Sequence, residues 1–347
     1  MDYLVDVNIA VYNHALFLEK TLDSVLEQKT NFPFRLLIGD DFSTDGSIEI
    51  LKRYEREFPD KIKVIYQPKN LGLNSPERNG IIILRKSTAK YIALLDGDDY
   101  WTDAYKLQKQ VDFLESNPEF SICFHLVESL NDQGQIIGEN NDQVSGPGVY
   151  TIVDLAKGNM IYTPSVVFRN MLNGELPDWF SKSFIGDYVL HMLSARHGKI
   201  YCIPEVMAVY RIHSAGTWSN GDLIFKTEKW TEMLGYLVEE FKYNSEVHNI
   251  LLSKYSRHLN WLSELYGDEK QYEMSSNYLI KALQTSEEYA SGWARDYYEL
   301  KTSNQLLRIE LQNIKQGFLS RLVRVMKNPG LVTKKIFSKS TKKIRAV

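Results

Sequence analysis

Cysteine is scarce in this chain, with only Cys123 and Cys202 among 347 residues. Each lies in an apolar run, "SICFHLV" and "KIYCIPEV", which is the usual setting of a buried, reduced thiol. A small scaffold held together by disulfides is therefore excluded, and the sequence favours a reducing compartment.

Long hydrophobic runs are missing as well. No segment approaches the roughly 20 apolar residues that a membrane-spanning helix needs. The first residues, "MDYLVDVNIAVYN", lack the basic region and the following apolar stretch of a signal peptide. We therefore expect a cytoplasmic protein that does not span a membrane.

Glycine-rich phosphate loops are absent after the first predicted strand. The segment "AVYNHALFLEK" contains neither GxGxxG nor GxxxxGK[ST]. Dinucleotide-dependent redox chemistry and P-loop phosphoryl transfer are therefore disfavoured.

What is present is the composition of a soluble globular protein, with 44% apolar and 24% charged residues. The length predicts a main domain with an appendage. The formal charge of −3 hides an asymmetry, because residues 311–347 carry ten Lys or Arg and no Asp or Glu, which leaves residues 1–310 with 31 − 44 = −13. A basic tail thus follows an acidic body.

Apolar patterns alternate between strand and helix through the first hundred residues. Short, nearly continuous apolar strands separated by helices predict an α/β fold with a doubly wound, mostly parallel sheet. Strands are predicted at residues 5–13, 34–41, 61–67 and 90–99, and helices at residues 17–28, 47–58 and 77–87.

The pattern changes in the rest of the chain. A helix is predicted at 105–118, strands at 121–129 and 164–170, a helix at 185–198 and an extended segment at 199–213. From about Asp222 the pattern is helical, and in residues 307–325 apolar side chains recur every three or four positions. We expect a main α/β domain at 1–220, a helical C-terminal region at 221–326 and a basic tail at 327–347.

Acidic residues end two of the predicted strands. Asp40 and Asp41 follow one strand, and Asp96, Asp98 and Asp99 follow another. In open α/β sheets ligands bind beyond the carboxyl ends of the strands, so both clusters are expected to face one crevice. Unpaired buried charge is very costly, and carboxylates suit Mg²⁺ or Mn²⁺, which bridge to substrate phosphates.

Four segments in this order and spacing resemble family 2 glycosyltransferases of the GT-A fold, the fold of nucleotide-diphospho-sugar transferases. They are "VNIAVYN", "TLDSVLEQ", "IGDDFSTDGS", and "YIALLDGDDYW" followed by "KLQKQVDFLE". The likeness covers roughly residues 4–215. It implies an inverting transferase of the hexosyltransferase type that moves a sugar from a nucleotide diphosphate to an acceptor hydroxyl.

The resemblance also implies roles for residues on the donor side. Asp41 matches the acid that accepts a hydrogen bond from N3–H of uracil or thymine, and its alternative role is an Asx-turn or helix cap, for which Asp45 or Ser47 fits better. Tyr12 is expected near the same base. Ala10 is placed there too, although it stands where a small hydroxyl residue often lies, which weakens a side-chain contact.

Metal and phosphate roles follow from the same resemblance. Asp98 matches the direct ligand of Mn²⁺ or Mg²⁺, and Asp96 matches the partner that holds the ribose or a metal-bound water. His213 in "VYRIHSAG" is a further metal ligand by this resemblance, and Arg211 a contact to the diphosphate. An exposed loop histidine with no such role is the alternative for His213.

Asp187 in "FIGDYVLHMLSARHG" has two interpretations. It lies at the start of a predicted helix, so it can be an N-cap. By resemblance it is the general base, which deprotonates the acceptor hydroxyl opposite the leaving diphosphate, so that the anomeric configuration inverts.

Two other function classes compete with a transferase. A sugar nucleotidyltransferase shares the sheet and acids but needs a Gly-rich, Arg-containing loop that "VYNHALF" lacks. A non-catalytic sugar-nucleotide-binding scaffold is disfavoured because Asp41, Asp96, Asp98 and Asp187 are all retained. The expected donor is a UDP-sugar or a dTDP-sugar, and no nucleic-acid partner is expected.

The basic tail suggests the acceptor and the location. Near an anionic leaflet each Lys or Arg contributes about 1 kcal/mol, so the tail can hold the protein at the inner face of the cell membrane. The acceptor is then a cell-surface glycan or a lipid-linked oligosaccharide. Solvated disorder of the tail is the alternative, and the helices before it offer a surface for homo-oligomers.

Overall fold

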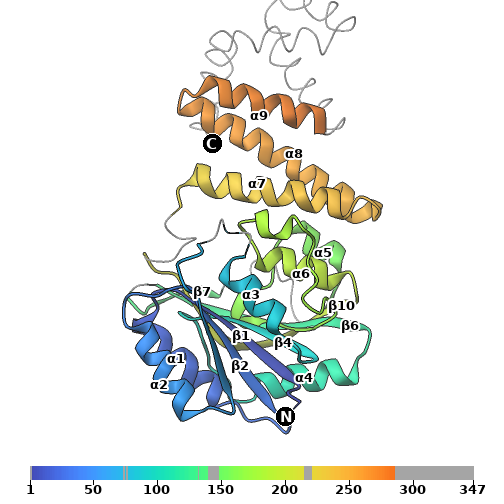
Figure 1. Ribbon diagram of the computed structural model, residues 1–347. Coiled ribbons are helices and arrows are strands. Elements are labelled where there is room, and N and C mark those ends of the chain that lie inside the picture. The colour runs from blue at the N-terminus through green and yellow to red at the C-terminus, as the bar shows by residue number, and fades with distance from the viewer. Residues whose placement is uncertain are drawn as a thin grey trace, which may run out of the picture. The chain divides into compact units, whose positions relative to one another are not determined.

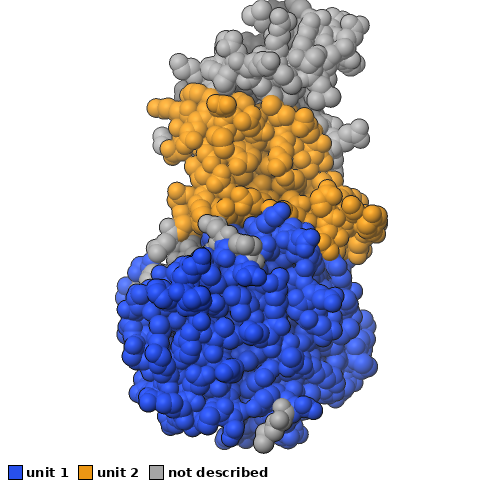
Figure 2. All heavy atoms as spheres, in the orientation of Figure 1, with its two compact units in different colours: residues 1–220 blue, residues 221–347 orange. Residues whose placement is uncertain are grey.

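The computed structural model describes residues 2–72, 75, 77–131, 133–139, 148–214 and 221–285. The chain divides into two compact units, Met1–Asn220 and Gly221–Val347 (Figure 2). The predicted basic tail and the apolar stripe at 307–325 lie outside the described residues.

The first half of unit 1 alternates strands and helices, as the apolar patterns predict (Figure 1). Its elements are β1 (Val5–Val11), α1 (Ala15–Leu26), β2 (Phe34–Asp40), α2 (Ser47–Glu57), β3 (Ile62–Tyr66), α3 (Asn79–Lys86) and β4 (Tyr91–Asp96).

The second half of unit 1 contains shorter strands between its helices. Four of its elements were not predicted, namely β5, β7, β8 and α5. The elements are β5 (Tyr100–Trp101), α4 (Lys106–Ser116), β6 (Phe120–Leu130), β7 (Ile136–Glu139), β8 (Gly148–Tyr150), α5 (Ile152–Lys157), β9 (Val167–Arg169), α6 (Asp187–Ala195) and β10 (Lys199–Arg211), with short 3-10 helices at Thr163–Ser165 and Phe180–Lys182.

The ten strands among the described residues form one sheet. Eight of them follow the order β3-β2-β1-β4-β9-β6-β10-β5, while β7 pairs with β6 and β8 pairs with β10. The four strands β3, β2, β1 and β4 are parallel to one another, as predicted. The other half is mixed, because β9 runs antiparallel to both β4 and β6 while β10 is parallel to β6. The order in which strands are added reverses between β1 and β4, because β2 and β3 lie on one side of β1 and β4 lies on the other. Open α/β sheets bind ligands at such a switch point.

The side chains of β1 show how the two faces of the sheet differ. Val5, Val7, Ile9 and Val11 are fully buried and pack in one core with apolar residues of α1, α2 and α4. Because side chains alternate along a strand, Asn8 points to the opposite face, where its Oδ1 accepts a hydrogen bond from the Ser87 hydroxyl at 2.9 Å. This opposite face is the one that α3 covers.

The same alternation shows to which face of the sheet Asp96, the last residue of β4, points. Tyr91, Ala93 and Leu95 belong to the core on the side of α1, α2 and α4. Asp96 therefore points to the opposite face, together with Ala10, its parallel partner on β1. The side chain of Asp96 thus lies on the face of the sheet that α3 covers.

Unit 2 is helical over its described residues, as predicted, with α7 (Leu223–Glu240), α8 (Ser245–Asp268) and α9 (Tyr272–Thr285). Glu228 on α7 accepts hydrogen bonds from the hydroxyls of Tyr266 on α8 (2.6 Å) and Tyr278 on α9 (3.1 Å). One carboxylate therefore ties the three helices together. In the part of the chain that the structure describes, no helix has the length and hydropathy needed to cross a membrane.

Candidate active site

The turn after β4 packs directly on the end of β1. The Gly97 N–H donates to the Ala10 carbonyl oxygen at 2.9 Å. A Cβ atom on Gly97 would lie 2.6 Å from Nδ1 of His14 and 3.2 Å from the Ala10 oxygen. Glycine is required between Asp96 and Asp98 because no side chain fits between the turn and β1.

Gly97→Ala is therefore expected to destabilise the protein by about 1–3 kcal/mol, the usual cost of overpacking. Urea unfolding measures the change. Gly80→Ala is the matched control, because nothing lies within 4 Å of its Cβ position on α3, and alanine should stabilise this helix by about 0.5–1 kcal/mol. Equal stability of the Gly97 variant and the wild type would contradict the close approach.

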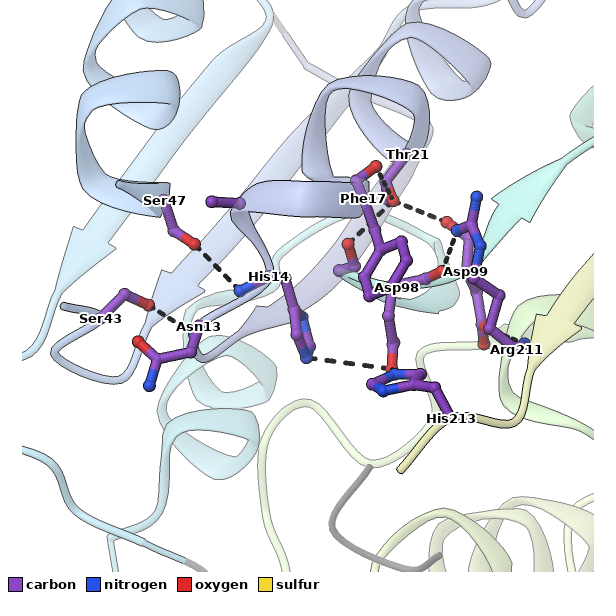
Figure 3. A network of polar contacts seen from close by, with 12 residues as sticks. Asn13, His14, Phe17, Thr21, Ser43, Ser47, Asp98, Asp99, Arg211 and His213 are labelled. Atoms are coloured by element: carbon purple, nitrogen blue, oxygen red, sulfur yellow. Dashed lines mark hydrogen bonds and ion pairs between the residues drawn. The ribbon is translucent and has the colours of Figure 1, made fainter. Parts of the chain in front are cut away.

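Asp98 lies between two histidines (Figure 3). Its Oδ2 is 2.9 Å from Nε2 of His213 and 3.9 Å from Nε2 of His14. Burial opposes ionisation of Asp98, but the hydrogen bond to His213 and the charges of His14 and His213 lower its pKa overall. Asp98 is therefore held as a carboxylate.

Asp96 behaves in the opposite way. Burial, followed by repulsion from Asp98 and Asp187, raises the pKa of Asp96 to about 8. Burial also raises the pKa of Tyr210, and Asp99, Asp96, Asp187 and Asp98 all add to the rise. Charges that shift a pKa in this way lie nearby, so Asp96, the acids of the turn after it and Asp187 of α6 lie in the neighbourhood of Tyr210 on β10.

Asp99 fixes the end of β10 against this turn (Figure 3). Its buried carboxylate accepts the Arg211 N–H at 2.8 Å, and the Thr21 hydroxyl lies 2.7 Å from the Asp99 carbonyl oxygen. The Arg211 guanidinium donates to the Asp98 carbonyl oxygen and stacks on the ring of Phe17. The segment that carries His213 is thereby held beside Asp98.

The residues predicted for the base lie at the ends of β1 and β2. The Asp41 carboxylate accepts the N–H groups of Leu71 (2.8 Å) and Gly72 (3.1 Å). A carboxylate has about four lone-pair sites, so Asp41 retains acceptor capacity for a further donor. Tyr12 is 46% exposed, and Ala10 is the register partner of Asp96. Asp45, not Asp41, accepts the Ser47 N–H that begins α2.

Asp187 is the first residue of α6, and Gly186 occupies the N-cap position. Burial raises the pKa of Asp187, while the backbone N–H of Tyr188 and the charge of Arg78 oppose the rise. The carboxylate thus has a tendency to hold a proton, which is a property of general bases in enzymes.

The predicted metal ligands can be tested against this geometry. Among the described residues no group of three or more His, Cys, Asp or Glu side chains is arranged as a complete metal site. Two of the three predicted ligands, Asp98 and His213, have donor atoms 2.9 Å apart, and neighbouring ligands about 2.1 Å from an octahedral ion are about 3.0 Å apart. The carboxylates of Asp96 and Asp98 therefore suit Mn²⁺ or Mg²⁺ in chemistry, and the spacing of Asp98 and His213 would allow both to bind one ion.

Sequence patterns missed His14 and Arg78. His14 ends the loop after β1, and Arg78 precedes α3. The sequence signal for His14 is the glycine at position 97, where a side chain would collide with the His14 ring. Both residues reach the site through contacts between distant segments, which no local pattern encodes.

Comparison with known proteins agrees with this arrangement. The sequence model described as glycosyl transferase family 2 matches residues 6–163. The Bacillus subtilis protein TuaG, whose name describes a teichuronic acid biosynthesis glycosyltransferase, is 38% identical over 221 residues, which are 62% of this chain and 82% of TuaG. The uncharacterized Mycobacterium tuberculosis protein Rv1520 is 34% identical over 60% of this chain, and the chain spans 58% of its length.

Solved structures share the fold. Staphylococcus aureus TarS, crystallised with UDP-GlcNAc, has a TM-score of 0.63 at 16% identity, covering 84% of this chain and 83% of TarS. The Pyrobaculum calidifontis mannosyltransferase PcManGT, in complex with GDP-Man and Mn²⁺, has a TM-score of 0.51 at 15% identity, covering 96% of this chain and 89% of that chain. The fold is the GT-A fold, and the chain belongs to glycosyltransferase family 2.

Proposed function

We propose that this protein transfers a sugar from a nucleoside-diphosphate sugar to an acceptor hydroxyl with inversion at the anomeric carbon. The observation that carries the proposal is the convergence of Asp96, Asp98 and Asp187 beyond the carboxyl end of β4, where their charges act on one another. Three neighbouring carboxylates that are shielded from water repel one another, so binding of a cation or of a proton is needed to offset the cost of burying their charges. A diphosphate held through a dication, and a base that receives a proton, meet this need.

The donor is expected to be a UDP-sugar or a dTDP-sugar. Asp41 can accept the N3–H that uracil and thymine share, and Tyr12 offers an exposed ring at the end of the neighbouring strand. The complexes of TarS with UDP-GlcNAc and of PcManGT with GDP-Man support a nucleotide-sugar donor of some kind. Asp41 is the reason to prefer UDP or dTDP over GDP.

Asp98, Asp96 and His213 would hold Mn²⁺ or Mg²⁺. Such a cation neutralises the charge of the leaving diphosphate. Arg211 lies against the same turn and adds a positive charge on the diphosphate side. Asp187 is expected to take the proton of the acceptor hydroxyl, from the face of the sugar opposite the diphosphate.

A screen of nucleotide sugars tests the proposed function. UDP-, dTDP- and GDP-sugars are incubated with the full chain and Mn²⁺, and the release of nucleoside diphosphate and the melting temperature are measured. We expect release and thermal stabilisation with a UDP- or dTDP-sugar. Stabilisation without release, with acceptor glycans present, would favour the non-catalytic scaffold, and no response to any nucleotide sugar would refute nucleotide-sugar binding.

The acceptor is proposed to be a growing cell-surface glycan or a lipid-linked oligosaccharide. The name of the relative TuaG, which describes teichuronic acid biosynthesis, supports a polysaccharide. The ten basic residues of 311–347 support a peripheral position at the inner face of the membrane. Homo-oligomers through the C-terminal helices stay a prediction.

Deleting residues 318–347 is expected to release the protein from anionic liposomes without lowering turnover on a soluble acceptor. The reason is the loss of nine of the ten basic residues in a segment without acids. Co-sedimentation with phosphatidylserine vesicles at low and high salt measures the effect. Equal sedimentation of the full and shortened chains would show that the tail does not bind the membrane.

A further inference from the structure

Arg78 is a buried cation whose hydrogen bonds reach far along the chain. Its side chain is 7% exposed. Its Nη1 donates to the carbonyl oxygens of Ser183 at 2.5 Å and of Phe184 at 3.2 Å. Its Nη2 lies 3.5 Å from the carbonyl oxygen of Phe180. The guanidinium also lies over the Phe180 ring, 5.6 Å from its centroid. Arg78 thus binds the segment that leads into α6.

The contact continues to the residue before Asp187. A Cβ atom on Gly186 would lie 2.9 Å from Nη2 of Arg78, so the guanidinium packs against the backbone at the start of α6. The planar fork of arginine can bind several carbonyl oxygens at fixed angles, which a lysine ammonium cannot do. The position of the first turn of α6 therefore depends on Arg78.

The charge of Arg78 also acts on Asp187, the first residue of α6. Burial lowers the pKa of Arg78, and Asp187 is the acid that opposes this effect. The groups that act on Asp187 come from three other elements: Arg78 before α3, Asp96 at the end of β4 and Tyr210 on β10. Arg78 is the cation in this set, and neutral carbonyl groups bind it, so its charge remains available to Asp187.

We propose that Arg78 is a positioning residue for Asp187, because its hydrogen bonds tie the segment that leads into α6 to the start of α3 and its guanidinium packs against Gly186. This inference rests on the proposed function, in which Asp187 is the general base. Arg78 then has two separable effects, one on the position of Asp187 and one on its ionisation. Substitutions that keep or remove the charge distinguish them.

Arg78→Met removes both effects. Displacing a catalytic group by about 1 Å can cost about 10²-fold in rate, so kcat should fall by this order while KM for the donor stays unchanged. Loss of a nearby cation favours the protonated carboxyl group, so the acidic limb of the kcat–pH profile should move to higher pH. Arg78→Lys keeps the charge, so it should lower kcat but leave the limb in place.

Arg169→Met is the matched control. Arg169 also donates to backbone carbonyl oxygens, Phe120 at 2.7 Å and Asn117 at 3.3 Å. It pairs in register with Tyr91, the first residue of β4, which is roughly 16 Å along the strand from Asp96. Its loss should lower stability without moving the pH limb. An unmoved limb in Arg78→Met, with kcat no lower than in Arg169→Met, would overturn the proposal.

Hydrogen exchange separates this inference from the proposed function. In Arg78→Met, amide protons of residues 180–190 should exchange faster than in the wild type and in Arg169→Met, whether or not a donor sugar has been identified. Unchanged protection there refutes the tether. If the tether holds but Asp187→Asn keeps full activity, the proposed function has the wrong base and Arg78 does not act on catalysis.

Discussion

Asp187→Asn is expected to slow sugar transfer by about 10²- to 10⁴-fold, the usual contribution of a general base. Asparagine keeps the shape of the side chain but cannot receive a proton from the acceptor hydroxyl. Donor affinity should barely change, since the proposed role lies on the acceptor side of the sugar. The measurements are kcat at saturating donor and acceptor, a UDP titration and a melting curve.

If Asp187 has only a structural role, a different result is expected for the turnover and stability of Asp187→Asn. Asp187 follows the N-cap Gly186, so asparagine would lose only the interaction of the charge with the helix dipole, about 0.3–1 kcal/mol. Turnover and most of the stability would then survive. Asp154→Asn is a suitable control, because Asp154 also lies in a first helical turn, where its Oδ2 accepts the Thr151 N–H at 3.0 Å. Loss of UDP binding or of folding in Asp187→Asn would mark Asp187 as a structural residue.

The parallel half of the sheet could be predicted because the burial of its strands is reflected in the apolar patterns of their sequences. Both faces of these strands are covered, and β4, "YIALLD", is accordingly a nearly continuous apolar run. In β1, "VDVNIAV", β-branched apolar residues alternate with Asp6, Asn8 and Ala10, which is a strand pattern too. The strands β5, β7 and β8 have two to four residues, which is too short for any periodicity. Their pairing with β6 and β10 depends on the finished sheet.

The candidate site divides in a similar way. The acids at the strand ends are visible in the sequence, because a charge cluster behind an apolar run is rare and local. The roles of Asp187 and His213 were inferred from family resemblance, since each is a single residue in an ordinary context. The part played by Arg78 could not be foreseen, because its partners lie more than 100 residues away.

Asp98→Ala is expected to abolish divalent-dependent donor binding while leaving the fold intact. Asp98 is the acid held as a carboxylate, so its removal takes the direct ligand from the cation. Losing an outer-shell partner of a metal ligand already costs 10- to 100-fold in affinity, and losing the ligand itself should exceed about 10²-fold. Calorimetric titration with UDP, in Mn²⁺ and in EDTA, measures the metal-dependent part.

Repulsion among the acids decides what happens to stability in Asp98→Ala. The variant loses the hydrogen bond to His213, but Asp96 and Asp99 each lose a neighbouring charge that raises their pKa. These effects oppose each other, so the melting temperature without metal should stay close to that of the wild type. Asp103→Ala is the control, because Asp103 pairs with Lys109 at 2.7 Å outside the cluster and should leave Mn²⁺-dependent UDP binding unchanged. Equal UDP affinity of the wild type and Asp98→Ala in Mn²⁺ would rule out Asp98 as the metal ligand.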